Sequence, residues 1–267
     1  MKPWKKLLLG LAGIFALTSL AACSSSTNTL DKVKNKGTLT VALNPHFAPF
    51  EFKTIQDGKD TIAGADIEIA KAIGDELGVK VKFSEMSFDN VLASVQSGKA
   101  DIAIAGISVT NERKKVYDFS DSYYTSENVV IVKKDKVNDF TSADSLAKQT
   151  VGTQKGSVQE TIAKKQLSKA SVVSLASNGE MINELKSGQI QAVVLEKAIA
   201  EGYIAQNDDL TLASFNLKSD GSDAYAVAIR KGSDDLLKEI NAVIKETKES
   251  GKFDQWLKEA SSYKQSK

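Results

Sequence analysis

The sequence predicts an α/β protein in which two similar lobes, joined by two strands, enclose a ligand cleft. Patterns typical of strands and helices alternate over residues 38–105, and they do so again over residues 150–195 of the 267-residue chain. This alternation indicates βαβ units, in which a helix joins parallel strands through a right-handed crossover. Extended apolar segments follow the two runs at residues 128–133 and 223–229. They are expected to be the strands that leave lobe one and return to it.

The first run predicts three strands, over residues 38–43, 79–83 and 100–105, and two helices between them, over residues 65–77 and 88–97. The strand segments alternate or are β-branched, and the helix segments have apolar residues three and four positions apart. A glycine ends each helix, at Gly78 and Gly98. The last strand is almost entirely apolar, which is typical of a buried parallel strand. Ligands bind at the carboxyl ends of such strands, so the loops that follow them are the expected place for a site.

The second run has the same rhythm, with strands expected over residues 150–152, 171–175 and 190–195 and helices over 158–167 and 181–186. The segments VQSGKADI (95–102) and LKSGQIQA (185–192) share a helix end, a glycine, a short turn and the start of a buried strand. This echo indicates two lobes of similar architecture rather than a true short repeat. Apolar residues at helical spacing over 233–260 predict C-terminal helices that pack back on lobe one.

The N-terminus has the composition of a secretory leader. Three lysines precede a 14-residue apolar stretch, which is too short for a stable membrane span, and the only cysteine, Cys23, closes the segment LAAC. This segment resembles a bacterial lipobox, which implies that Cys23 carries a lipid; a plain signal peptide with an incidental cysteine is the alternative. We expect a leader over residues 1–22 and a lipidated cysteine with a flexible tether over residues 23–36. Lobe one is expected over residues 37–130, lobe two over residues 131–223, and a hinge return with C-terminal helices over residues 224–267.

Composition excludes several classes of function. The chain has 35 basic and 34 acidic residues, and loss of three leader lysines leaves 32 and 34, so no bulk charge favours nucleic acid. The single histidine, His46, excludes sites with several histidine ligands and argues against a Ser-His-Asp hydrolase. No nucleotide-binding or metalloprotease motif occurs. We therefore expect no metal, no cofactor and no enzymatic activity.

Arginine usage points to one candidate residue. Only two of the 35 basic residues are arginines, Arg113 and Arg230. Arg113 follows the expected buried strand 100–105, where a planar guanidinium can hold a carboxylate through two parallel hydrogen bonds. Thr110 is a candidate N-cap for the turn that carries Arg113, and Ser108 adds a hydroxyl. The alternative is a surface arginine in the first turn of a helix.

Residues 103–124 (AIAGISVTNERKKVYDFSDSYY) resemble the signature of the polar amino-acid-binding proteins of ABC importers, extracellular solute-binding family 3. The likeness runs from about residue 37 to 256 and includes PFEF (49–52), GADIEI (64–69), SGKAD (97–101), VGTQKGS (151–157) and GKFDQW (251–256). The resemblance, which includes the glutamine-binding proteins, implies a type II periplasmic-binding-protein fold with a double-strand hinge and a monomer.

The resemblance also implies how the ligand backbone is held. Arg113 would bind the α-carboxylate, assisted by Ser108 and by the amide of Ser157 beside Val158 in lobe two. The carbonyl of Gly106 would accept from the ligand ammonium, because glycine lets the backbone approach closely. Ser157 alternatively serves only as an N-cap.

Five further residues complete the expected site. Glu196 would bind the ammonium where the family usually has aspartate; alternatively, it is a solvated residue at a helix start. Phe47 and Phe88 would enclose the ligand side chain, although both residues could instead belong to the core. Asn44 would touch the side chain, and as a neutral group that donates or accepts it suits an amide such as that of glutamine. Phe52 is included among the ligand-binding residues.

These features predict a lipoprotein anchored on the outer face of the cell membrane. It would capture a free L-amino acid, glutamine-like or basic, by closing its lobes, and deliver it to permease and ATPase subunits. One alternative is a dehydratase on the same scaffold, for which Glu196 is the obvious general acid. Another is a surface sensor or adhesin without a role in transport.

Overall fold

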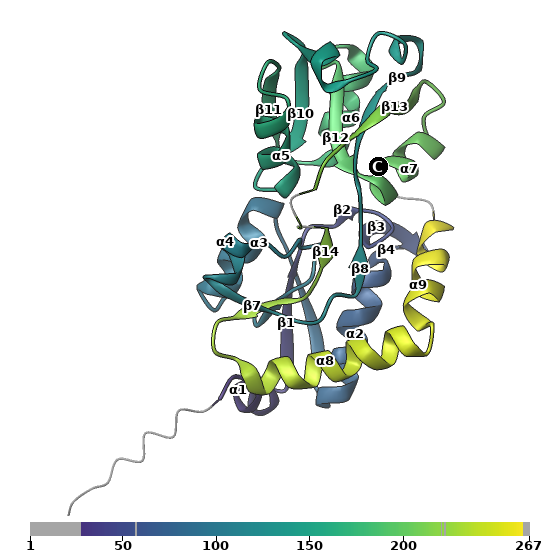
Figure 1. The fold of residues 1–267 in the computed structure, drawn as a ribbon. Coiled ribbons are helices and arrows are strands. Elements are labelled where there is room, and N and C mark those ends of the chain that lie inside the picture. The colour runs from purple at the N-terminus through teal and green to yellow at the C-terminus, as the bar shows by residue number, and fades with distance from the viewer. Residues whose placement is uncertain (1–27, 57, 220, 222, 264–267) are drawn as a thin grey trace, which may run out of the picture.

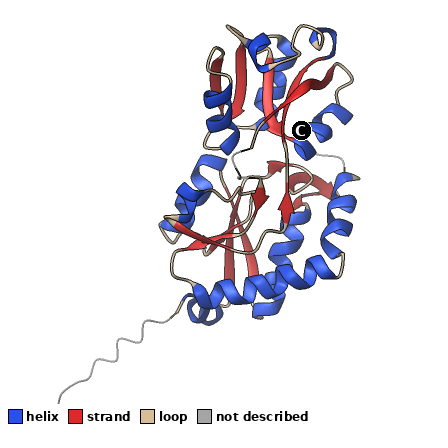
Figure 2. Cartoon of the chain, in the orientation of Figure 1, coloured by secondary structure: helices blue, strands red, loops and turns tan. Residues whose placement is uncertain are grey.

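The computed structural model has two α/β lobes stacked end to end (Figure 1). The structure describes residues 28–263 except 57, 220 and 222, so the predicted leader and Cys23 lie outside the described residues. In each lobe helices flank a central sheet (Figure 2). The predicted fold class is confirmed, and the details of each lobe explain how the cleft between them is built.

The sheet of lobe one has five strands in the order β5-β1-β6-β15-β7. Their bounds are Lys80–Glu85, Thr38–Leu43, Ile102–Ala103, Ala228–Arg230 and Tyr117–Phe119. β1 is parallel to β5 and β6, whereas β15 is antiparallel to β6 and β7. The predicted strand 100–105 is therefore shorter than expected, because the chain leaves the ladder after Ala103, although Ile104 and Ala105 stay buried.

Helices cover both faces of this sheet. The helices of lobe one are α1 (Thr29–Lys36), α2 (Ala65–Leu77), α3 (Phe88–Gln96), α4 (Asn111–Lys114), α8 (Asp234–Glu249) and α9 (Lys252–Ser261). Because successive residues of a strand point to opposite faces, Val41 packs into the cluster that contains α2 and α8, and Ala42 packs into the cluster that contains α3. The bounds predicted for α2 are confirmed, and the predicted C-terminal helices lie under and beside lobe one (Figure 1).

Helix α1 corrects one prediction. Residues 23–36 were expected to be a flexible tether, but Thr29–Lys36 is helical, so the prediction is wrong for these residues. The side chain of Asn28 accepts from Asp31 N at 2.7 Å and caps the helix, while Val33 is buried in the core. The sequence concealed α1 because Val33 is its only buried residue among polar and charged neighbours.

Lobe two has a sheet in the order β11-β10-β12-β9-β13, with bounds Ser171–Leu175, Thr150–Gln154, Ala192–Glu196, Asn128–Lys133 and Leu210–Leu217. Its helices are α5 (Val158–Gln166), α6 (Asn178–Ser187) and α7 (Lys197–Ala205), with short 3-10 turns at Lys134–Lys136 and Ala143–Leu146. β10 is parallel to β11 and β12, as the βαβ pattern predicts. β13 was not predicted, although its residues 210, 212, 215 and 217 are apolar.

The lobes are joined where β8 (Tyr124–Thr125) pairs antiparallel with β14 (Ala224–Tyr225). In Figure 1 this pair lies in the upper part of lobe one, on the side toward lobe two. The two apolar segments expected at the hinge are therefore strands, but most of their residues lie inside the lobes and not where the chain passes from one lobe to the other. Residues 128–133 form β9 inside lobe two, and residues 228–230 form β15 inside lobe one. A small sheet of β2 (His46–Phe47), β3 (Glu51–Gln56) and β4 (Lys59–Ala63) completes the cleft side of lobe one.

Candidate ligand-binding cleft

Most of the predicted site residues converge at the junction of the lobes. Gly106, Ser108 and Arg113 follow β6 in lobe one, as the position of the predicted buried strand implies. Glu196 ends β12 in lobe two, and Val158 begins α5. The lobes meet at this place, because Arg113 Nη2 donates to Gly156 O at 3.2 Å.

Arg113 is held in place by its own loop. Its backbone N–H donates to Thr110 Oγ1 at 3.1 Å, which confirms the predicted N-cap, and its Nη1 donates to Ser108 O at 2.7 Å. Burial lowers the pKa of the guanidinium to about 10, and the charge of Glu196 opposes this shift. Arg113 therefore stays cationic at neutral pH and retains further N–H donors for an anion.

Glu196 provides the opposite charge across the cleft. Its side chain belongs to a residue that is only 7% exposed at the junction of β12 and α7. Burial raises the pKa of its carboxyl group to about 7, while hydrogen bonds to the carboxylate and the positive charge of Arg113 oppose the shift. The carboxyl group is thus half ionised near neutral pH, and a cation bound beside it favours the ionised form.

Gly106 and Phe47 form a tight contact in the wall of the cleft. Gly106 has φ +53°, and a Cβ atom there would lie 2.4 Å from Phe47 Cε1. The ring of Phe47 also packs at 5.6 Å from that of Phe50, centroid to centroid. Phe47 therefore belongs to the core, as the alternative interpretation held, while its ring also covers the loop that carries Arg113.

The remaining candidates differ in how they face the cleft. Asn44 is buried, its Nδ2 donates to Met86 O at 2.8 Å, and its Oδ1 accepts from Gln154 Nε2 of lobe two at 3.4 Å. Phe88 begins α3 and is half-buried against the cluster on that side of the sheet. Asn44 therefore presents a carbonyl oxygen, and not its NH₂ group, toward lobe two.

Ser157 has the alternative role of an N-cap, and Phe52 lies away from the other candidates. Ser157 is the N-cap of α5, and both its N–H and its hydroxyl donate to Gln154 O, at 3.2 and 2.7 Å. Its backbone amide is therefore occupied, whereas the N–H of Val158, at the first position of α5, has no acceptor within the helix. Phe52 packs with Ala63 and Ala260, so the structure does not bring it to the other candidates. It follows Glu51 in β3 and points to the opposite face of the strand.

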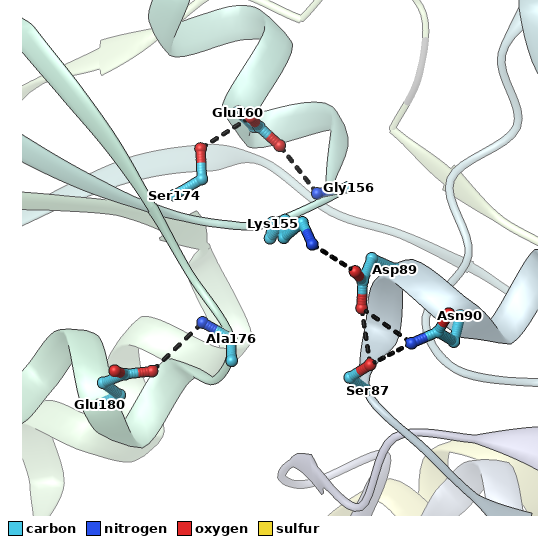
Figure 3. A network of polar contacts seen from close by, with 9 residues as sticks. All are labelled: Ser87, Asp89, Asn90, Lys155, Gly156, Glu160, Ser174, Ala176 and Glu180. Carbon is cyan, nitrogen blue, oxygen red and sulfur yellow. Dashed lines mark hydrogen bonds and ion pairs between the residues drawn. The ribbon is translucent and has the colours of Figure 1, made fainter.

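Contacts that sequence reasoning did not find hold the two lobes together. Lys155 Nζ of lobe two lies 2.9 Å from Asp89 Oδ2 of lobe one, and Asp89 is oriented by a hydrogen bond from Ser87 (Figure 3). Gly156 lies so close to Asp89 that an added Cβ would be 3.1 Å from its Cα atom. Asn178 Nδ2 also reaches the carbonyl oxygen of His46 at 3.4 Å. No local pattern could have paired these residues, because each contact joins segments that are distant in the sequence.

Two α/β lobes joined by paired strands, with an arginine on one lobe and a carboxyl group on the other that influence each other's pKa, define a two-lobe binding protein of the type II periplasmic class. The family model for bacterial extracellular solute-binding proteins, family 3, matches residues 39–260. The chain belongs to this family, which confirms the resemblance noted in its motifs. Among the described residues no helix is both long and apolar enough to cross a membrane.

Individual relatives agree with this assignment. The arginine-binding extracellular protein ArtP of Bacillus subtilis (strain 168) is 34% identical over 263 residues, which cover 97% of each chain. The substrate-binding protein AbpA of an amino acid ABC transporter from Streptococcus pneumoniae Canada MDR_19A, solved with L-arginine bound, is 52% identical with a TM-score of 0.84 and covers 86% of this chain and 97% of its own. The ancestral amino acid-binding protein AncCDT-1, a precursor of cyclohexadienyl dehydratase, is 35% identical with a TM-score of 0.78 and covers 86% and 98%.

Proposed function

We propose that the protein is the substrate-binding component of an ABC importer and captures a free L-amino acid for permease and ATPase subunits. The observation that carries this proposal is the placement of Arg113 and Glu196 on different lobes, close enough for each charge to shift the pKa of the other. A zwitterion between them would place its carboxylate on Arg113 and its ammonium on Glu196. Each ionic contact would be charge-assisted and largely shielded from water.

The ligand we propose is a basic amino acid, with L-arginine first. AbpA was solved with L-arginine and ArtP is called arginine-binding. In this chain Asn44 Oδ1, which accepts one bond from Gln154, has a second lone pair that would accept from a ligand donor. Asn178 Oδ1 is buried with no donor among the described residues. A guanidinium group has five N–H donors to satisfy such oxygens, whereas a second carboxylate would bring none. Glutamine, whose amide also donates, is the second choice.

A ligand screen tests this proposal. We expect L-arginine to raise the melting temperature of the purified protein more than the other amino acids and cystine do, with L-glutamate inert. A ligand at a hundredfold excess over its Kd stabilises the protein by about 2.7 kcal/mol. Scanning fluorimetry followed by calorimetry gives the order of affinities. If no amino acid shifts melting, capture is refuted. Turnover of prephenate or arogenate would instead support the dehydratase, for which Glu196 is a suitable acid because its pKa is about 7.

We also propose that Cys23 carries the lipid anchor and keeps the protein on the outer face of the cell membrane, as a monomer. The lipobox-like LAAC segment before the described residues supports this proposal. Replacement Cys23→Ser is expected to move the protein from the membrane fraction to the medium or the periplasm and to abolish labelling by a fatty acid. Unchanged membrane association of that variant would refute the lipid anchor.

Ligand binding is expected to be coupled to closure of the two lobes. Contacts made only in the closed state favour that state together with the ligand, because a ligand shifts the population toward the conformation that it binds better. The Lys155–Asp89 ion pair and the Asn178–His46 contact join the two lobes and are therefore expected to break when the cleft opens. These two contacts would stabilise the closed state without contacting the ligand.

The Lys155–Asp89 pair gives a quantitative prediction. The Lys155 side chain is 63% exposed and that of Asp89 is 25% exposed, so solvent screens the pair and its contribution should be small. Replacement Lys155→Ala is expected to raise the ligand Kd by up to about fivefold at low salt, and the effect should shrink at high salt. Lys169→Ala is the matched control, because Lys169 pairs with Asp144 within lobe two. Calorimetry at two salt concentrations distinguishes them; equal effects of both variants would contradict a role in closure.

A further inference from the structure

Two acidic side chains meet inside lobe one, next to the loop that begins at Gly106. Glu51 of β3 is 0% exposed and Asp66 of α2 is 1% exposed. Their carboxyl groups face each other at hydrogen-bonding range. No N–H or O–H donor of the other described residues reaches Glu51 Oε1, Glu51 Oε2 or Asp66 Oδ1. Buried polar atoms nearly always have a partner, so these three oxygens need an explanation.

A single proton between the two groups supplies that explanation. Two carboxylates in contact cannot both be ionised in a buried place, because each charge disfavours the other and neither is solvated. If one group is a neutral acid, its hydroxyl donates to the other, and each group then has a hydrogen-bond partner. The other titratable groups that face the pair are Glu196, Tyr123 and Tyr225. Glu196 has the same sign and adds to the requirement for a proton.

The hydrogen bonds decide which group keeps the proton. Asp66 Oδ2 accepts from Gly106 N at 3.0 Å and from Tyr123 Oη at 3.0 Å. These two donors stabilise a negative charge on Asp66, and Glu51 has no comparable donor. The pKa shifts agree: burial raises the pKa of Glu51 well above its ordinary range, whereas burial raises that of Asp66 only to about 6 because its hydrogen bonds oppose the shift. Glu51 is thus the acid and Asp66 the carboxylate at neutral pH.

We propose that Glu51 is a permanently protonated carboxylic acid that donates to Asp66 Oδ1, and that Asp66 in turn positions the ligand-binding loop through the N–H of Gly106. The loop is adjacent: Gly106 has φ +53° and packs on Phe47, and the carbonyl oxygen of Ser108, two residues on, accepts from Arg113. Glu51 and Asp66 are positioning residues that do not need to touch the ligand. Only the claim that the position of this loop affects ligand binding rests on the proposed function.

Two substitutions of Glu51 distinguish loss of the hydrogen-bond donor from a change in the size of the side chain. Glu51→Gln keeps an N–H donor and the size of the side chain, so we expect ligand affinity within about threefold of the unaltered protein. Glu51→Met keeps the length but removes the donor, and it should weaken binding at least about tenfold. Glu68→Met is the control, because Glu68 lies on α2 near Asp66 but pairs with Lys71 at the surface. Equal losses in Glu51→Gln and Glu51→Met would overturn the proposal.

Two measurements without ligand test the proton and the loop directly. At pH 8.5, infrared spectra should show the C=O band of a protonated carboxylic acid, and the difference spectrum against Glu51→Gln should assign it to Glu51. Amide exchange at Gly106 should be at least about tenfold faster in Glu51→Met and unchanged in Glu51→Gln. Absence of the band, or its persistence in Glu51→Gln, would overturn the proposal. Because neither readout needs a ligand, the shared proton can stand even if no amino acid binds.

Discussion

Replacing Arg113 by alanine is expected to weaken binding of the amino-acid ligand by roughly two to three orders of magnitude. The guanidinium is desolvated and fixed by Ser108 O, and in the proposed complex it is the main partner of the ligand carboxylate. Truncating one member of a buried, hydrogen-bonded charge pair costs about 2–5 kcal/mol, and each 1.4 kcal/mol is a factor of ten in Kd. Stability without ligand should change little, because loss of Arg113 removes two hydrogen bonds to backbone carbonyl oxygens but also removes the cost of burying its charge.

Two further variants sharpen this test. Arg230→Ala removes the only other arginine, which is exposed in lobe one, and should leave affinity unchanged. Arg113→Lys keeps the charge but loses the planar fork, so an intermediate loss is expected. Calorimetry gives the affinities and scanning fluorimetry gives the melting temperatures without ligand. Unaltered affinity of Arg113→Ala would show that the carboxylate site has been assigned to the wrong residue.

Arg113 illustrates what a sequence can reveal about a site. Its rarity and its place after an apolar strand were visible without coordinates, because ligand sites form at the carboxyl ends of parallel strands. The same position after the strand drew attention to Ser108, whereas the role of Gly106 was implied by the family resemblance. Helix α2 was predicted with its bounds because apolar spacing and a terminal glycine are local signals. Local signals are therefore sufficient for elements such as α2, although they missed α1 and β13.

Glu51 and Asp66 illustrate what such reasoning missed. Acidic residues in a strand and in the first turn of a helix normally face water, so nothing marked these two as buried. The signal that could have found them is their setting, since Asp66 lies between Ala65 and Ile67, both fully buried. Lys155 and Asp89 were missed for another reason: their contact exists only because the lobes meet, and that geometry depends on tertiary structure. Phe52 was misassigned because one step along a strand reverses the face to which a side chain points.

Replacing Glu196 by glutamine is expected to weaken ligand binding by about thirtyfold or more and to remove its dependence on pH. Glutamine keeps the size but lacks the charge that would pair with the ligand ammonium, for which a loss of about 2–4 kcal/mol is typical. In the unaltered protein the pKa of Glu196 is about 7 before binding. The ammonium pairs with the ionised form, so binding lowers this pKa and releases a proton. Affinity should therefore fall by about tenfold in total as the pH drops from 8 to 6, because the ionised fraction of a group with a pKa of about 7 falls by that factor.

Calorimetry at pH 7 in two buffers of different ionisation enthalpy measures the released proton directly. About half a proton is expected for the unaltered protein and none for Glu196→Gln. Glu201→Gln, a change at an exposed residue of the helix α7 that begins after Glu196, is the matched control and should behave as the unaltered protein does. A pH dependence that persists in Glu196→Gln above pH 6.5 would assign the proton to another group.

Stability without ligand provides an independent check on Glu196. A carboxyl group whose pKa is raised on folding binds its proton more tightly in the folded state. Its favourable effect is fully present below the ordinary glutamate pKa and is lost as the pH rises through about 7. For this shift the loss is up to about 3 kcal/mol. Glu196→Gln cannot lose a proton, so at pH 8 it should melt without ligand at or above the temperature of the unaltered protein while binding far more weakly. A substitution that keeps or raises stability but weakens binding is expected at a residue whose role is to bind the ligand. At a residue needed only for the fold, substitution would lower both stability and affinity.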